Sequence, residues 1–111
     1  MGLALVEVPR FRAVLERRGA RFTARVFSPA ELAYAANKKQ GWQNLAARFA
    51  AKLAGRQALG RGLPIAAFEV ERLRSGAPRL RCAARPEVAL FLSLTHDADF
   101  ALASVWVEAA P

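Results

Sequence analysis

The sequence predicts an α+β fold in which helices pack against a mostly antiparallel sheet. Three observations support this prediction: a strand-like segment opens the chain, helical patterns follow it up to residue 59, and alternating strand-like segments fill most of the remainder. A chain of 111 residues has the length of one domain with its own core, which we assign to residues 1–111. No repeat, linker or low-complexity segment divides it.

The chain begins with a predicted strand followed by a predicted helix. Residues 3–8 alternate loosely and are rich in Leu and Val, and Pro9 ends this strand. Residues 10–18 carry apolar side chains at helical spacing, and Gly19 closes the helix. Residues 21–27 are expected to form a short helical or extended link.

A capping motif marks the start of the next helix. Ser28 stands at the N-cap, Pro29 at the first helical position and Glu31 at the third, which is the order of a capping box. The helix is expected to continue through about Ala36, and residues 37–41 are predicted to form a turn.

The longest predicted helix begins near Asn44 and ends at Leu59, with Gly60 expected as a left-handed C-terminal cap. Apolar side chains at four-residue spacing form a stripe that we expect in the core: Leu45, Phe49 and Leu53. Cationic side chains repeat at the same spacing beside it: Arg48, Lys52 and Arg56. Cations on adjacent turns repel one another, so we expect an anionic partner for them.

After residue 64 the pattern changes to strands. Residues 67–73 and 79–82 predict a hairpin, residues 86–90 a short helix, and residues 91–94 and 100–107 two further strands. These last two strands flank a predicted loop that contains the only histidine, His96.

The charges are distributed unevenly. No acidic residue occurs between Glu31 and Glu69, whereas six cations fall in this interval: Lys38, Lys39, Arg48, Lys52, Arg56 and Arg61. Two interpretations are open: a solvated basic face with counter-charges elsewhere in the fold, or a phosphate-binding face. The net charge of +8 favours polyanionic partners, such as a nucleotide-like cofactor, an acidic protein or nucleic acid.

The composition limits the possible sites and locations. Hydrophobic residues make up 54% of the chain, which is high for this length. Either the core is unusually rich, or part of the apolar surface is buried against another subunit, so we expect an oligomer. The single cysteine, Cys82, excludes an internal disulfide and a cysteine-based zinc cluster within one chain. No signal peptide is recognisable and no stretch approaches the ~20 apolar residues of a membrane span, so we expect a cytoplasmic protein with no membrane partner.

Several kinds of site are open for His96 and its neighbours. A turn whose side chains bond their own backbone explains the residues without a ligand. A metal site built from His96, Asp97 and Asp99 has weak spacing. A Ser-His-Asp hydrolase is disfavoured, because Ser93 lies on the same strand end as His96 and no nucleophile elbow is present.

Three segments together resemble the small holo-acyl-carrier-protein synthases, the short bacterial class of 4'-phosphopantetheinyl transferases. Residues 2–8 (GLALVEV) are similar to the family's opening strand, Gly-Ile-Asp-Ile-Val-Glu-Ile. Residues 48–54 (RFAAKLA) are similar to its Arg-Phe-Ala-Ala-Lys-Glu-Ala, and residues 93–96 (SLTH) to its Ser-Leu-Ser-His. The order and spacing of these segments extend the resemblance over nearly the whole chain.

The resemblance implies transfer of the phosphopantetheine arm of coenzyme A to a serine of an acyl carrier protein. It also implies a homotrimer with active sites between protomers and magnesium on the pyrophosphate. By the same resemblance, Lys52 and His96 are the expected catalytic residues. The expected coenzyme A-binding residues are Arg48, Lys52, Arg56, Ser93 and His96.

Two positions depart from the family pattern. The aspartate of the first strand and the glutamate after the helix lysine, the family's magnesium ligands, are Ala4 and Leu53 here. Neither side chain offers an oxygen, and magnesium requires near-octahedral oxygen coordination, so we assign no metal ligand. Glu7 cannot replace Ala4, because strand alternation points it to the opposite face. Asp97 or Asp99 could approach from the loop.

Two functions therefore remain open from the sequence. One is a working transferase in which a displaced metal or the cations Arg48, Lys52 and Arg56, with His96, neutralise the moving charge. The other is a non-catalytic relative that keeps the fold, the trimer and the binding of coenzyme A or a carrier protein. A nucleic-acid-binding protein rests on charge alone and lacks interleaved aromatics or a reading helix, so it is disfavoured.

Overall fold

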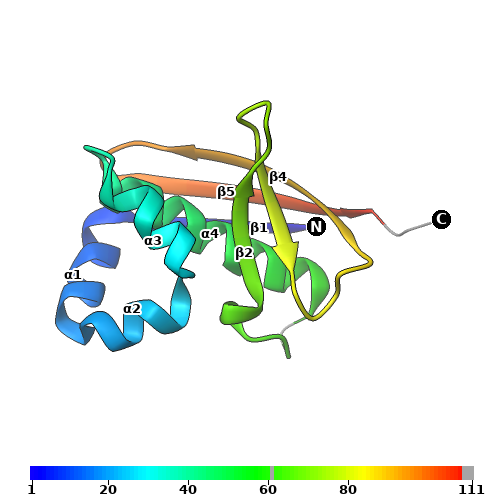
Figure 1. The fold of residues 1–111 in the computed structure, drawn as a ribbon, viewed down its shortest axis with the longest axis horizontal. Helices are drawn as coiled ribbons and strands as arrows, with labels where there is room; N and C mark the ends of the chain where they lie inside the picture. Colours follow the sequence, from blue (N-terminus) through cyan, green and yellow to red (C-terminus); the bar gives the residue numbers. More distant parts are fainter. Residues whose placement is uncertain (61, 109–111) are drawn as a thin grey trace.

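The computed structural model describes residues 1–60 and 62–108, so Arg61 of the acid-free stretch lies outside the described residues. The elements follow the order β1 (Gly2–Glu7), α1 (Val8–Arg18), α2 (Ala20–Val26), α3 (Pro29–Ala36), α4 (Gly41–Leu59), the 3-10 helix η1 (Ile65–Ala67), β2 (Phe68–Arg72), β3 (Pro78–Cys82), β4 (Ala89–His96) and β5 (Phe100–Glu108) (Figure 1). The predicted α+β fold is confirmed. None of the helices in these ranges is long and apolar enough to cross a membrane.

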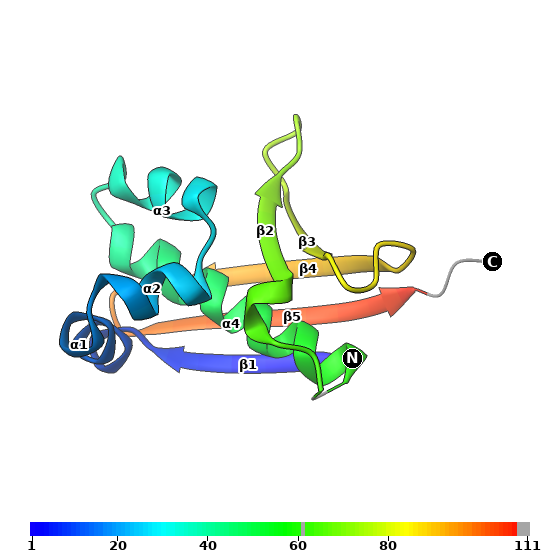
Figure 2. The same cartoon turned by 60° about the horizontal axis from the view of Figure 1, so that its bottom comes forward.

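Two antiparallel sheets pack against helix α4. The larger sheet has the strand order β1-β5-β4, and the smaller is the β2–β3 hairpin. The hairpin stands across the strands of the larger sheet (Figures 1 and 2). Helices α1 to α3 gather around the N-terminal half of α4 (Figure 1). The centre of α4 therefore contacts elements from both halves of the chain.

Helix α4 packs on the sheet through alanines rather than through the predicted stripe. The alanines of its buried face are Ala46, Ala47, Ala50, Ala51 and Ala54. Their small size lets the strands approach closely: a Cβ at Gly2 would lie 1.7 Å from the carbonyl oxygen of Ala54. Of the predicted stripe only Leu45 is fully buried, whereas Phe49 and Leu53 are partly exposed. Leu45 lies in the core and Phe49 and Leu53 pack against it, so the predicted stripe lines the edge of the core.

The corner before α3 agrees with the sequence, whereas at the beginning of the chain α1 starts at Val8, so Pro9 lies in the first turn of the helix rather than ending the strand. Ser28 and Glu31 form the predicted capping box, each side chain bonding the other residue's backbone N–H. The link predicted over residues 21–27 to be either helical or extended is mostly helical, since it forms α2. Gly60 ends α4 with φ 139° and ψ 141°, a positive φ outside the left-handed helical region that we expected.

The region before β5 differs from the prediction in two respects. The predicted helix over residues 86–90 is wrong, because Leu90 pairs with Val107 and β4 begins at Ala89. His96 lies at the end of β4, opposite Ala101, rather than within a loop. Long-range pairing with β5 decides both outcomes, and a local pattern cannot reveal it.

The face of the larger sheet that points away from α4 is apolar and exposed. Strand alternation and register place the following residues on this outer face: Leu3, Leu5, Phe91, Phe100, Leu102 and Trp106. Each is at least 36% exposed. A monomeric protein rarely leaves so many large apolar side chains exposed on one face.

Candidate functional site

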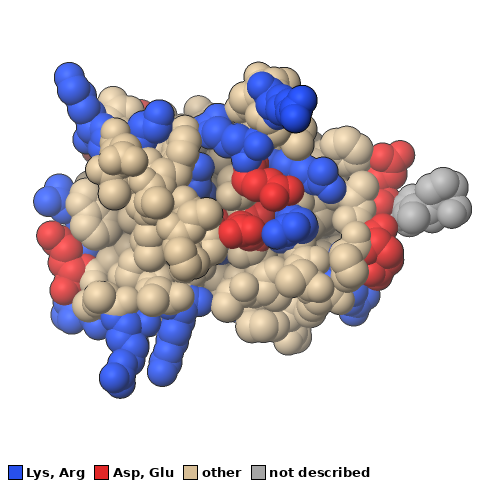
Figure 3. All heavy atoms as spheres, viewed as in Figure 1, with Lys and Arg blue, Asp and Glu red and all other residues tan. Residues whose placement is uncertain are grey.

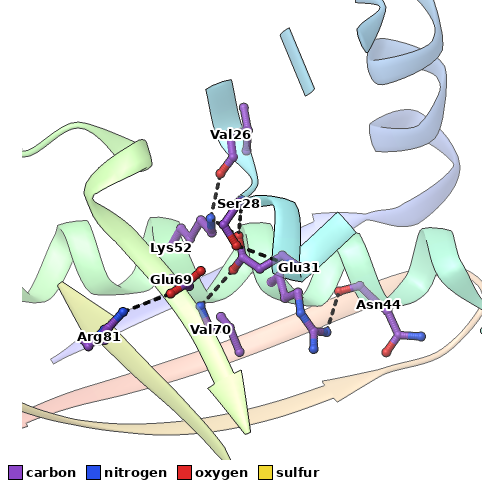
Figure 4. A network of polar contacts seen from close by, with 9 residues as sticks. Val26, Ser28, Glu31, Asn44, Lys52, Glu69, Val70 and Arg81 are labelled. Carbon is purple, nitrogen blue, oxygen red and sulfur yellow. Dashed lines mark hydrogen bonds and ion pairs between the residues drawn. The ribbon is translucent and has the colours of Figure 1, made fainter. Parts of the chain in front are cut away.

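Lys52 lies at the centre of a buried polar network that joins α4 to α3 and β2 (Figure 4). Its amine lies 2.6 Å from Glu31 Oε1 and 2.6 Å from the carbonyl oxygen of Val26, and the residue is 1% exposed. Glu31 Oε2 accepts a hydrogen bond of 2.8 Å from the Val70 N–H. The ion pair therefore connects the corner before α3, the middle of α4 and strand β2.

The positive charge of Lys52 is compensated by the negative charge of Glu31 within this network. Burial lowers the pKa of Lys52, and the Glu31 carboxylate beside it acts in the opposite direction. Two buried charges are tolerated only when they pair and their remaining polar atoms are bonded, which the backbone partners of Glu31 provide. At the edge of the network, the Ser28 hydroxyl and then Arg81 lower the pKa of Glu69 by hydrogen bonding to its carboxylate. The predicted contact of Lys52 with phosphate stays a prediction.

Arg48, one turn before Lys52, belongs to a cluster of cations around one aromatic ring. The Cζ of Arg48 lies 4.4 Å from the ring centroid of Tyr34, and Arg72 Cζ and Lys38 Nζ lie 5.0 Å and 4.8 Å from it. Arg48 is 3% exposed and donates one hydrogen bond, from Nη1 to the Asn44 carbonyl at 3.4 Å. We call Tyr34, Lys38, Arg48 and Arg72 the Tyr34 cluster.

The Tyr34 cluster has unused capacity for an anion. Among the described residues, Arg48 Nε is the one buried side-chain nitrogen or oxygen without a hydrogen-bond partner, and no carboxylate there forms an ion pair with Arg48. Burial lowers the pKa of Arg48, and the neighbouring Arg72 lowers it further. An anion close to the cluster would supply the missing negative charge.

His96 and Asp97 define the opposite end of the site region. His96 Nδ1 lies 2.9 Å from Gln43 Oε1 of α4. This contact ties the His96 ring to the side chain of Gln43 in α4. The Asp97 carboxylate accepts from the N–H groups of Asp99 and Phe100, each at 2.8 Å, and these bonds lower its pKa. Asp97 therefore holds the loop that fixes His96.

The remaining predicted residues do not converge within one chain. Ser93 pairs with Ser104 on the outer sheet face, whereas His96 lies on the face that carries α4. Arg56 is half-buried in the last turn of α4, two turns from Arg48. The structure thus brings Arg48 and Lys52 into the interior, leaves His96 exposed at the edge, and separates Ser93 from both.

The resemblance implies magnesium ligands at positions 4 and 53, and both positions have apolar side chains in apolar surroundings. Ala4 is buried opposite Ala103 on the face of β1 that packs on α4. Leu53 lines a pocket of about 540 Å³ whose walls are almost entirely aromatic and aliphatic. Within residues 1–60 and 62–108, no group of three His, Cys, Asp or Glu side chains could hold a metal ion. The residues present do not fit magnesium.

Sequence reasoning missed three participants in the site. Tyr34 and Arg72 complete the cationic cluster, and Gln43 orients His96. A local signal existed only for Tyr34, which lies one helical turn after Glu31 and so shares its face of α3. Glu31 was recognised as a helix cap, but its ion pair with Lys52 spans 21 residues and leaves no local trace.

A family model described as the 4'-phosphopantetheinyl transferase superfamily matches residues 1–105. The chain belongs to this superfamily. It is 39% identical to the holo-[acyl-carrier-protein] synthase of Solibacter usitatus, with 96% of this chain and 95% of the relative covered. It is 42% identical to that of Anaeromyxobacter dehalogenans, with 99% and 95% covered. The family resemblance found in the sequence is thereby confirmed, as is the enzyme class, a transferase.

Solved structures of the same superfamily share the fold. The holo-(acyl-carrier-protein) synthase of Bacillus anthracis in complex with CoA (3',5'-ADP) is 28% identical with a TM-score of 0.84, covering 98% of this chain and 95% of that one. The Helicobacter pylori enzyme in complex with coenzyme A is 26% identical with a TM-score of 0.83, covering 96% and 98%. The predicted 4'-phosphopantetheinyl transferase-like fold is therefore confirmed.

Proposed function

We propose that this chain transfers the 4'-phosphopantetheine arm of coenzyme A to a serine hydroxyl of an acyl carrier protein. The observation that carries the proposal is the buried Arg48 guanidinium, which lacks an acidic partner among the described residues and stands beside Arg72 and Lys38. A ligand with several phosphates fits such a cluster. The names of its relatives and the coenzyme A held by similar folds support the same substrate.

In the proposed reaction, the serine oxygen bonds to the phosphorus that carries the arm. The bond from that phosphorus to the nucleotide oxygen breaks, and 3',5'-ADP leaves. In this proposal His96 takes up the serine proton through Nε2, while Gln43 holds the ring through Nδ1. Arg48 and Arg56 would balance negative charge on the phosphates, as cations do in phosphoryl transfer. No step is assigned to a metal.

We infer a positioning role for Lys52 in addition to its predicted contact with coenzyme A. Its ion pair with Glu31 holds α3 and β2 against α4, and these elements carry Tyr34 and Arg72. The pair thus fixes the ring around which Arg48 and Arg72 gather. The geometry of the Tyr34 cluster therefore depends on Lys52, a buried residue.

We also infer that the chain acts as a homotrimer in the cytoplasm, with residues 1–111 as one functional domain. The exposed apolar face of the larger sheet supports self-association. Ser93 lies on this face, so a neighbouring protomer could bring it to a shared site. Basic side chains project from the side of the molecule formed by α1 and α2 (Figure 3). The exposed arginines of these two helices suit an acidic carrier protein: Arg10, Arg12, Arg17, Arg18, Arg21 and Arg25.

A second function is favoured by one observation, the loss of both magnesium ligands at Ala4 and Leu53. In this alternative the chain binds coenzyme A or a carrier protein without catalysing transfer.

Mass spectrometry of an apo acyl carrier protein incubated with the protein and coenzyme A tests both functions. We expect the carrier protein to gain the mass of one phosphopantetheine arm. The variant Arg48→Met should lose most of this activity, whereas Arg74→Met, which removes an exposed arginine in the β2–β3 turn, should retain it. Absence of transfer to several carrier proteins, together with coenzyme A binding by calorimetry, would establish the binding-only alternative.

A further inference from the structure

The face of β1 that packs on α4 is apolar and buried, so it offers no ligand to a metal ion. Ala4 is 8% exposed, and Val6, Ala101 and Ala103 share its face of the sheet. The alanines of α4 cover these residues. A divalent cation placed here would lose its water shell and find no carboxylate to replace it, which is strongly unfavourable.

The position of Leu53 is equally apolar. Its pocket is lined by residues of α1, α2, α4 and β1, with Phe11, Phe22 and Phe49 among them. The two charged residues at this pocket, Glu7 and Arg10, form an exposed ion pair with each other at 3.6 Å. Strand alternation keeps Glu7 on the face opposite to Ala4, where it pairs with Phe100 in register.

The carboxylates of Glu31 and Asp97 already form hydrogen bonds or ion pairs away from positions 4 and 53. Glu31, the buried acid, is bonded to Lys52 and to the Ser28 and Val70 N–H groups. Asp97 is bonded to the backbone of its own loop. The described part of the chain therefore offers no replacement ligand set, and its deepest unpartnered charge is a cation, Arg48.

From this geometry we infer that binding of coenzyme A by this chain is independent of magnesium, because cations of the protein balance the phosphates at a site from which the metal ligands are missing. The inference rests on the proposed function, since it concerns the same ligand. It removes, for coenzyme A binding, the magnesium requirement that the family resemblance implies.

Calorimetric titration of the unmodified protein with coenzyme A tests the inference. The titration is run once with magnesium chloride and once with a chelator, at equal ionic strength because salt screens phosphate contacts. We expect the two dissociation constants to agree within about twofold. Binding that is about tenfold tighter with magnesium would overturn the inference while leaving the proposed function intact. No binding in either buffer would overturn the proposed function itself, and the inference with it.

A gain-of-function variant provides an independent test. The double variant Ala4→Asp, Leu53→Glu restores the two carboxylates, and Ala4→Asn, Leu53→Gln is its uncharged control. We expect electron paramagnetic resonance of Mn²⁺, with coenzyme A present, to detect a bound ion only in the carboxylate variant. A bound ion in the unmodified protein would contradict the inference. The titration of the unmodified protein remains decisive where a double variant does not fold.

Discussion

Arg48 and Lys52 lie one turn apart on α4, yet their environments differ in one respect that determines their roles. Lys52 has a carboxylate at 2.6 Å, so its charge is compensated within the fold. Arg48 is buried to a similar degree and has only a carbonyl and an aromatic ring as partners. A buried cation without a carboxylate is unfavourable in isolation and becomes favourable when an anion binds. This difference supports the proposal that Arg48 binds phosphate and that Lys52 positions the elements around it.

The first prediction concerns the variant Lys52→Met, which keeps the volume and removes the charge. Glu31 would remain buried without its partner, and breaking a buried pair in this way costs about 3–5 kcal/mol. We expect urea unfolding to show a loss of this order, and Lys39→Met, an exposed lysine, to show almost none. The double variant Glu31→Gln, Lys52→Met should recover part of the loss. Equal stability of Lys52→Met and Lys39→Met would refute the structural role.

The second prediction concerns Asp97. Backbone hydrogen bonds lower its folded pKa below the ordinary value of 3.8, so its contribution to stability is complete above that value and disappears as the pH falls through the folded pKa. The variant Asp97→Asn should be less stable than the parent near neutral pH, and the difference should shrink below pH 3.8. Urea unfolding at a series of pH values measures it. A difference that stays constant to low pH would show that the carboxylate charge plays no part.

At the scale of elements, α4 holds the β2–β3 hairpin through a close contact at Gly55. A Cβ there would lie 2.6 Å from Leu80 Cδ2 and 2.9 Å from Phe68 Cε1, both of which are buried. The absence of a side chain at this position lets the hairpin lie against the helix. Because the hairpin carries Arg72, its seating on α4 also affects the Tyr34 cluster.

The third prediction is that Gly55→Ala destabilises the fold. Overpacking costs about 1–3 kcal/mol, from which the better helix propensity of alanine recovers up to about 1 kcal/mol. Gly62→Ala is the matched control, since a Cβ there would meet nothing within 4 Å. We expect urea unfolding to show a loss only for Gly55→Ala, accompanied by weaker coenzyme A binding. A gain in stability would mean that the hairpin can shift away without penalty.

The elements that the sequence predicted well are those specified by local chemistry. The capping box at Ser28, the stop at Gly19 and the hairpin after residue 67 each depend on a few neighbouring residues. The extent of β4 depends instead on pairing with β5, which explains the wrong helix over residues 86–90. For the candidate site, the motif pointed to Arg48 and Lys52, and their functional roles stay predictions. Their burial and partners depend on contacts across the fold that spacing does not encode.

At the scale of the whole molecule, the apolar side chains lie in two regions, the core and the outer face of the larger sheet. Some of them form the core around α4, and others cover the outer face of the larger sheet, where Leu102 lies at the centre of the middle strand with Leu5 and Thr95 opposite it in register. Burying this face against other copies would remove it from water at about 25 cal/mol per Å². The small core of a chain of this length gains the most from such association.

The fourth prediction follows for Leu102→Glu, which places a charge at the centre of this face. We expect light scattering to give the mass of a trimer for the parent protein and of a monomer for the variant, because a buried, unpaired carboxylate opposes association. Leu73→Glu is the control: this leucine is also exposed but lies next to the hairpin turn, away from the sheet face. It should remain trimeric. If the active sites form between protomers, transfer activity should fall in Leu102→Glu and not in Leu73→Glu. A Leu102→Glu variant that remains a trimer would exclude this face as the interface.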